Sequence, residues 1–236
     1  MSPESGTLCG SEVLDNPVWA ALTGPHRDFA EFAPAGLAAR YTLDTSPFSA
    51  LADPQDPRAW ADLAALAGPG EEVWVTGLLT PPPGWQTLVT VPGVQLDGRG
   101  VRAGAAPEAV ALGLGDVPEM LELVGLTKPG PFLDRTVELG TYLGIRHEGR
   151  LVAMAGERMR PEGWSEISAV CTHPDHRGRG LAARLIRAVA AEVRERGERP
   201  FLHAAAANTG AVRLYESMGF TLRRSPLFLG LRTPQA

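Results

Sequence analysis

Apolar residues recur along this chain with two different spacings, and each spacing predicts a type of element. In the second half, leucine and valine stand at every fourth position from Leu181 to Val193, which predicts a helix over 181–196 with one buried stripe. A capping aspartate and an early proline begin a second helix over 116–126. The other elements expected here are two strands within 136–159 joined by a tight turn, strands over 165–172, 200–207 and 220–231, and a helix over 209–218.

The first half shows shorter periodic runs, which proline and glycine interrupt often. The elements expected here are helices over 18–32 and 57–68 and strands over 71–79 and 85–91. The pattern weakens over 94–110. We therefore place a boundary near residue 105 and expect two units, residues 1–105 and 106–236. We find no internal sequence repeat.

The bulk composition predicts a cytoplasmic globular protein. The chain has 236 residues, 44% of them hydrophobic, and no apolar run long enough to cross a membrane. The N-terminus has neither the basic start nor the apolar core of a signal peptide. The absence of a long apolar run also means that we expect no membrane partner. Only Cys9 and Cys171 are cysteines, and they stand in unlike contexts, so we expect no disulfide framework.

Charge is distributed unevenly along the chain. Residues 1–110 carry 5 arginines against 13 acidic residues, whereas residues 111–236 carry 17 basic against 14 acidic residues. A nucleic-acid partner is not expected, because such a protein needs a basic face overall. The second half does permit a local anion site.

The stretch HPDHRGRGLAARL, residues 173–185, carries the clearest candidate chemistry. It joins a predicted strand to the predicted helix over 181–196, so Gly178 and Gly180 stand at a helix N-terminus. Such a terminus has free backbone N–H groups and a partial positive charge. Glycine lets a ligand touch this backbone, and Arg177 and Arg179 add cationic side chains. These features predict a pyrophosphate site.

Two other phosphate motifs fit this stretch less well. The P-loop requires a lysine and a serine or threonine after its last glycine, and Gly180 is followed by neither. The dinucleotide fingerprint is matched formally by Gly178, Gly180 and Ala183. In that fold, however, the strand runs straight into the first glycine, and here residues 173–176 intervene after strands that look like hairpins.

Cys171 raises two further alternatives. A metal site could be formed by Cys171, His173, Asp175 and His176. A structural zinc site usually has a tighter fourfold set, so we expect no metal. A nucleophilic thiol is also not expected, because an apolar strand offers nothing that would lower the thiol pKa.

Two motifs together resemble the GNAT superfamily of N-acetyltransferases. Arg177, Gly180 and Ala182 match its coenzyme A loop, [RQ]xxGx[GA]. The segment NTGAVRLYESMGF, 28 residues further on, is similar to its second hallmark; Asn208 and Tyr215 stand seven residues apart and share one side of a helix. The resemblance covers roughly residues 112–225 and extends to a bacterial subfamily related to the glycine N-acyltransferase-like proteins.

The resemblance implies an α/β (α+β) fold with a mixed, mostly antiparallel sheet flanked by helices. Residues 106–236 are then the catalytic GNAT domain. Residues 1–105 are expected to be a degenerate GNAT-like lobe that shapes the acceptor cleft or a dimer contact. The expected assembly is a monomer or homodimer.

The implied reaction moves an acetyl group from acetyl-CoA to an amine by direct attack in a ternary complex. The resemblance assigns the pantetheine arm and thioester to backbone groups of Val170, Cys171 and Thr172. It assigns the pyrophosphate to the amides of Arg177, Gly178, Arg179, Gly180, Leu181 and Ala182. Asn208 then adds a polar contact.

Two side chains are assigned to proton transfer. Tyr215 is expected to protonate the departing thiolate, and Glu166 to deprotonate the ammonium, whose pKa lies near ~10. The other interpretation of Glu166 is a solvated residue on a strand edge. Glu157 is the second candidate base. His203 is less favoured, because a lone histidine in an apolar strand is usually buried and hydrogen-bonded.

The acceptor stays open between a small amine, an amino acid, an antibiotic and a protein N-terminus, although the acidic first half favours a cation. A non-catalytic acyl-CoA-binding sensor or interaction module on the same fold is the alternative function. A nicotinamide oxidoreductase ranks third, because no βαβ unit was found.

Overall fold

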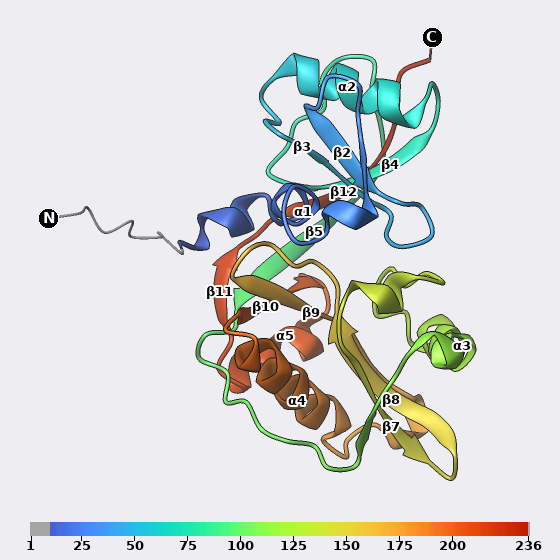
Figure 1. The fold of residues 1–236 in the computed structure, drawn as a ribbon, viewed down its shortest axis with the longest axis vertical. Coiled ribbons are helices and arrows are strands. Elements are labelled where there is room, and N and C mark those ends of the chain that lie inside the picture. Colours follow the sequence, from blue (N-terminus) through green and yellow to red (C-terminus); the bar gives the residue numbers. More distant parts are fainter. Residues whose placement is uncertain (1–9, 236) are drawn as a thin grey trace, which may run out of the picture.

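The computed structural model describes residues 10–235, which form two lobes (Figure 1). The first lobe begins with a 3-10 helix, η1, and a short α-helix. Its elements are η1 (Ser11–Asp15), α1 (Pro17–Leu22), η2 (Arg27–Phe29), β1 (Ala30–Phe32), β2 (Ala38–Tyr41), β3 (Phe48–Leu51), α2 (Pro57–Ala67), β4 (Glu72–Gly77) and β5 (Gln86–Asp97).

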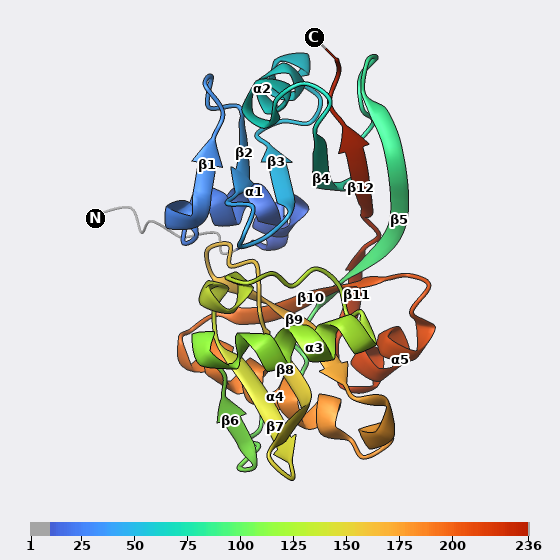
Figure 2. The same cartoon turned by 90° about the vertical axis from the view of Figure 1, so that its right-hand side faces the viewer.

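The second lobe holds most of the remaining chain (Figure 2). Its elements and the final strand are β6 (Ala109–Ala111), η3 (Leu114–Asp116), α3 (Val117–Thr127), η4 (Thr136–Leu139), β7 (Tyr142–His147), β8 (Arg150–Glu157), β9 (Trp164–Thr172), η5 (Pro174–His176), α4 (Leu181–Glu195), β10 (Arg199–Ala205), α5 (Thr209–Ser217), β11 (Thr221–Arg224) and β12 (Leu227–Arg232).

One twelve-stranded sheet runs through both lobes in the order β1-β2-β3-β4-β12-β5-β10-β9-β8-β7-β6, with β11 paired to β5. All described strand pairs are antiparallel except β3 with β4 and β9 with β10. The predicted mixed, mostly antiparallel sheet with flanking helices is therefore confirmed. Both parallel pairs are joined by a crossover helix, α2 in the first lobe and α4 in the second.

Two strands cross between the lobes. The first part of β5, from Gln86 to Pro92, pairs with β12, and the rest of β5 pairs with β10 and β11. β12 comes from the end of the chain, yet it also pairs with β4 in the first lobe. The division into residues 1–105 and 106–236 stays a proposal, and the hydrogen bonds of the sheet cross it.

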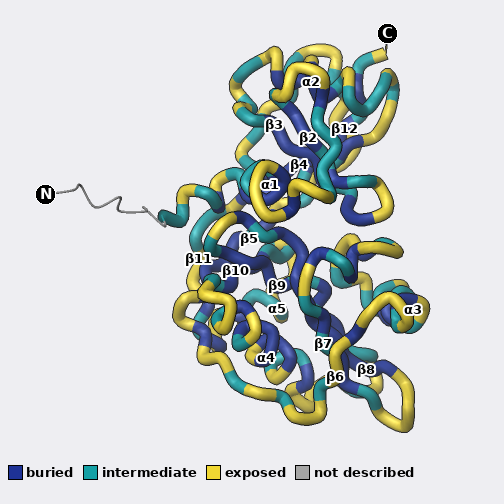
Figure 3. The backbone as a smooth tube through the Cα atoms, viewed as in Figure 1, coloured by how far each residue is buried: buried dark blue, intermediate teal, exposed yellow. Residues whose placement is uncertain are grey.

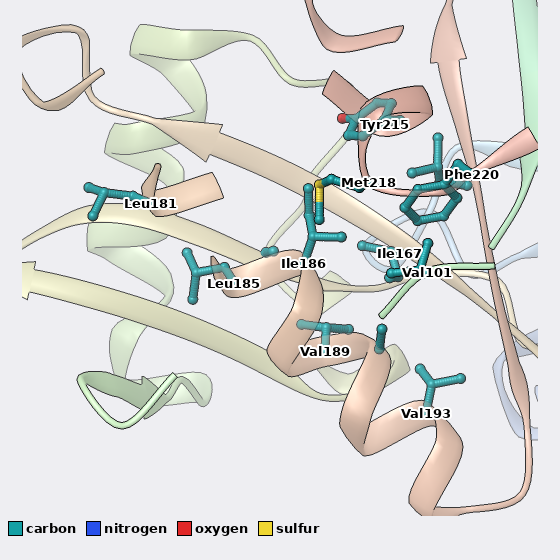
Figure 4. Close-up of a cluster of buried hydrophobic side chains, with 14 of the residues drawn as sticks. Val101, Ile167, Leu181, Leu185, Ile186, Val189, Val193, Tyr215, Met218 and Phe220 are labelled. Atoms are coloured by element: carbon teal, nitrogen blue, oxygen red, sulfur yellow. The ribbon is translucent and has the colours of Figure 1, made fainter. Parts of the chain in front are cut away.

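Helix α4 packs on the second lobe through the predicted stripe. Leu185, Val189 and Val193 are fully buried and Leu181 nearly so, which confirms the fourfold spacing (Figures 3 and 4). Gly197, with φ 77°, follows the helix end. The stripe fixes where α4 lies on the sheet, and so fixes the position of its N-terminus.

Several local predictions were wrong in the first half and around residue 136. The helix expected over 18–32 ends at Leu22, because Gly24 and Pro25 follow and proline cannot continue a helix. Residues 136–139 form a 3-10 helix instead of a strand. The short strands β1, β2, β3 and β6 were missed, since three or four residues show no measurable period.

Two expectations concern the membrane and the compartment in which the protein works. No helix in the described part of the chain is long and apolar enough to cross a membrane. Cys9 and the expected absence of a signal peptide concern residues that lie mainly outside the described range. Cys171 is buried with a free thiol.

Candidate active site

The two parallel strands of the second lobe part from each other and leave a wedge. β9 and β10 pair at three positions only, the last being Phe201 with Glu166. β9 then continues to Thr172 and β10 to Ala205 without further pairing between them. The backbone edges that face each other in this wedge are available to an extended ligand.

A bulge in β9 shapes one side of the wedge. Ala169 has φ 51°, a left-handed conformation that a non-glycine residue adopts rarely. The pairing with β8 shifts there, from Gly156 with Ser168 to Met154 with Cys171. The bulge re-aims residues 170–172 toward the wedge. Alanine gives no sequence signal for this conformation, and the bulge was not predicted.

The glycine-rich loop lies at the open end of the wedge. Gly178 and Gly180 have φ 75° and 72°, and Gly180 starts α4 with no side chain capping the helix. A Cβ at either glycine would meet nothing within 4 Å. Glycine is therefore favoured here by the positive φ of the backbone and not by a lack of space for a side chain. The exposed Arg177 makes a long bond to the Thr172 carbonyl at the end of β9, and Arg179 makes long contacts with the Asp175 carbonyl and His176 Nδ1. The amides and guanidinium groups therefore face open space.

Helix α5 follows the other strand of the wedge. Asn208 accepts a hydrogen bond from the Ala211 amide at 3.2 Å and caps this helix. Tyr215 is 8% exposed and packs edge-on to Phe220 (Figure 4). Its hydroxyl has no hydrogen-bond partner in residues 10–235. Burial, aided by the nearby Cys171, raises the pKa of Tyr215 to about 12, so the hydroxyl is a proton donor at neutral pH.

Glu166 lies at the apex of the wedge and is completely buried. Its carboxylate accepts bonds from Arg158 Nε at 3.0 Å and Nη2 at 2.7 Å, and from His203 Nδ1 at 2.8 Å. Burial alone would raise the pKa of Glu166, but Arg158 and His203 outweigh it and lower the pKa to about 2. The interpretation of Glu166 as a solvated strand-edge residue is therefore wrong.

His203 is held in one tautomer by its partners. Its Nδ1 faces the Glu166 carboxylate, so this nitrogen carries the proton, and its Nε2 lies 3.0 Å from the amide nitrogen of Gln95. Arg223 donates to the Gln95 carbonyl oxygen at 2.8 Å, which sets the direction of the amide. Both nitrogens of His203 are therefore engaged, as expected for a buried histidine.

Glu157, the second candidate base, is also buried and paired. Its carboxylate accepts from the Thr141 amide at 3.0 Å and bonds Ser165 and Arg196. The sequence did not indicate Arg158, Arg196 or Gln95 as partners, because Arg158 follows the neighbouring strand β8 and the other two lie far along the chain. Glu166 is therefore the acid of a buried ion pair with Arg158, whereas Glu157 is a buried acid whose partner Arg196 is partly exposed.

Two expectations about Cys171 can be compared with its surroundings. Burial raises the pKa of the thiol to about 11, which agrees with an inert side chain. Within residues 10–235, no group of three histidine, cysteine, aspartate or glutamate side chains is placed to hold a metal ion.

The first lobe covers the sheet beside Glu166. Ile167 and Leu202 pack with α4 on one face, whereas Trp164 and Phe201 pack with first-lobe residues on the other. The Arg158 guanidinium stacks over the first-lobe Phe48 ring at 5.0 Å. The apex of the wedge thus lies at the junction of the lobes.

Known proteins show the same architecture. The family model described as FR47-like protein matches residues 142–229. A structure of a GNAT-family acetyltransferase from Novosphingobium aromaticivorans is 43% identical with a TM-score of 0.84, covering 94% of this chain and 99% of that one. A GCN5-related N-acetyltransferase from Kribbella flavida, 18% identical with a TM-score of 0.62 over 90% of this chain and 93% of that chain, shares the fold.

A mycothiol acetyltransferase from Thermobispora bispora is 42% identical over 83 residues, 35% of this chain and 27% of that protein. The match thus spans about a quarter of that relative's length. The parted parallel strands and the glycine loop define the acetyltransferase class of fold. The chain belongs to the GNAT family and is an acetyltransferase of that family. Its place near the glycine N-acyltransferase-like proteins stays a prediction.

We predict that Glu166→Gln destabilises the protein by about 3–5 kcal/mol, because it leaves the Arg158 charge buried without a counter-ion. The double variant Glu166→Gln/Arg158→Met should recover most of this loss, since the glutamine can still accept from His203. Urea unfolding of the three proteins measures both effects. Equal stability of the single and double variants would contradict the charge argument.

The Glu166–Arg158 pair also makes the stability of the protein depend on pH in the acidic range. Because the pKa of Glu166 is lowered in the folded protein, its contribution is complete above the ordinary pKa of 4.5 and is lost as the pH falls from there through about 2. Unfolding free energy measured between these pH values should fall more steeply for the wild type than for the double variant.

Proposed function

We propose that this chain transfers an acetyl group from acetyl-CoA to an amine by direct attack within a ternary complex. The observation that carries the proposal is the wedge between β9 and β10, which opens onto the uncapped N-terminus of α4. An extended arm can lie in the wedge while its pyrophosphate meets the helix terminus. A ligand with an extended arm and a pyrophosphate would account for both the parted strands and the two glycines, Gly178 and Gly180.

The residues present fit the donor. Backbone groups of Val170, Cys171 and Thr172 would bind the pantetheine arm as an added strand, independent of their side chains. The amides from Arg177 to Ala182 would hold the pyrophosphate, with Asn208 as a further polar contact. The donor supplies an activated acyl group as a thioester. The open space before Gly178 and Gly180 admits the phosphate groups.

Tyr215 is the proposed general acid. Its hydroxyl is protonated and unpartnered, and a thiolate with a pKa of about 8.5 would accept its hydrogen bond as the carbon–sulfur bond breaks. The low polarity around the ring strengthens such a bond.

Glu166 remains the proposed base, with one added requirement. In the paired state its carboxylate is engaged by Arg158 and His203, and its pKa is too low to take a proton from a free ammonium. An acceptor ammonium must therefore first displace one of these partners. The carboxylate can then accept the proton as the nitrogen attacks.

The non-catalytic acyl-CoA-binding alternative is not favoured by the comparisons, in which this family's members are acetyltransferases. An acceptor amine would reach the apex from the face that the first lobe covers. The amine is a small molecule or a peptide end, and the first lobe is its proposed selector.

Acetyl-CoA and CoA should raise the melting temperature, and NADH should not. A ligand at about a hundred times its Kd adds about 2.7 kcal/mol. Gly180→Ala should largely abolish the rise, because its Cβ would stand in the phosphate approach. Gly149→Ala is the matched control: its φ is 82° with equally open surroundings, but it lies in the β7–β8 turn. Loss of the rise in both variants would point to strain alone.

Tyr215→Phe should lower kcat by about 10²-fold or more with little change in KM for acetyl-CoA, because only the proton donor is removed. Tyr142→Phe is the control, since it removes a tyrosine hydroxyl that is buried without a partner among the described residues and has no assigned role in the reaction. Steady-state release of CoA measures both. An unchanged kcat in Tyr215→Phe would assign the proton to water.

The Glu166→Gln/Arg158→Met variant separates a base from a structural ion pair, because it removes both charges together. A loss of about 10²-fold in kcat, with the remaining rate rising toward the acceptor's pKa, would support the base. Full activity at neutral pH would assign Glu166 to structure only.

A further inference from the structure

The first lobe contains a second wedge between parallel strands. β3 and β4 pair at only two positions, Phe48 with Trp74 and Ser49 with Val75, and then part. A cavity of about 390 Å³ opens where they separate. The residues of its lining that matter here are Asp15, Ser49, Thr76, Leu78, Leu79 and Arg224. It is separate from the wedge between β9 and β10.

The loop after β3 is unsuited to a phosphate. It carries Asp53 and Asp56 where the second lobe has glycines and arginines. Asp56 accepts from the Arg58 amide at 2.9 Å and so already caps the N-terminus of α2 with a negative charge. A polyphosphate would meet repulsion here, and the ligand must therefore be of another class.

A weakly held cation stands at the cavity. Arg223 and Arg224 both contact Asp15, but not equally. Arg223 has close acceptors, with 2.6 Å to Asp15 and 2.8 Å to Gln95. Arg224 reaches Asp15 only at 3.1 Å for the carboxylate and 3.5 Å for the carbonyl, and its side chain is 36% exposed. Arg223 therefore holds Asp15 with the shorter bonds, and the second arginine leaves this group with a net positive charge that can bind an anion.

The walls add one polar group to an apolar surface. The Thr76 hydroxyl is buried and has no hydrogen-bond partner among the described residues, which is uncommon for a buried polar group. The exposed Leu78 and the half-buried Leu79 supply aliphatic surface. One cation beside such walls matches a single carboxylate group on an apolar tail.

We propose that this wedge is a second ligand site, which takes a small carboxylate with an aliphatic tail. The carboxylate binds Arg224, and the tail lies along Leu78 and Leu79. The site is not the place of acetyl transfer, because Arg223, Gln95 and His203 stand in a hydrogen-bonded row between Asp15 and Glu166.

The test titrates the full chain with isovalerate, L-leucine and isovaleramide and follows backbone amide shifts by NMR. The two carboxylates should shift the amides of Ser49, Thr76 and Gly77 and leave those of Gly178 and Gly180 unchanged. Isovaleramide, equal in shape but uncharged, should bind at least about tenfold more weakly. No acetyl transfer is measured, so the result is independent of the proposed reaction.

Arg224→Gln should weaken isovalerate binding about tenfold or more, whereas Arg150→Gln, an exposed arginine on β8, should not. Thr76→Val keeps the shape of the wall and serves as a second variant that should stay folded; it should change the shift pattern at the cavity. Equal binding of isovalerate and isovaleramide, shifts confined to the other wedge, or no shifts at all would overturn the proposal.

Discussion

The separation of β9 from β10 after Glu166 and Phe201 is the constraint on which the site depends. Three residue pairs hold the strands together; α4 packs against both strands, and Tyr215 of α5 joins the same core cluster. The helix that crosses between parallel strands must start where the first strand ends, so its N-terminus opens onto the wedge. The parting of these two strands therefore sets where the glycine loop, Tyr215 and Glu166 lie relative to the wedge.

The buried Arg158–Glu166–His203 group sits where the strands stop pairing. Removing charges from water is costly, and such a group is retained only if its partners satisfy it fully. Here two lobes contribute: Gln95 also donates to the Leu14 carbonyl at 2.8 Å, and Arg158 stacks on Phe48. The polar row thus ties the apex of the wedge to the first lobe, and a proposed base in it is at the same time a structural element.

The two lobes use one backbone geometry with different loops. Each has a parallel pair that parts, a crossover helix and a strand supplied across the junction by β5 or β12. Gly178 and Gly180 make the second wedge suitable for phosphate, whereas Asp53 and Asp56 make the first one unsuitable. This parallel supports the proposal that the first lobe is a degenerate copy, although its sequence shows no repeat. The backbone provides the opening, and the loop chemistry selects the ligand.

The sequence by itself determined the α4 stripe, the strand–loop–helix order around Gly178 and Gly180, and the family, because these depend on neighbours a few residues apart. It did not determine the state of Glu166, since Arg158 lies eight residues away, just after the end of β8, and His203 lies 37 residues away. The bulge at Ala169, the crossing of β5 and β12, and the cavity in the first lobe also arose only in the tertiary structure. Pairing across a sheet is set by register between distant strands, and register leaves no periodic trace in a single chain.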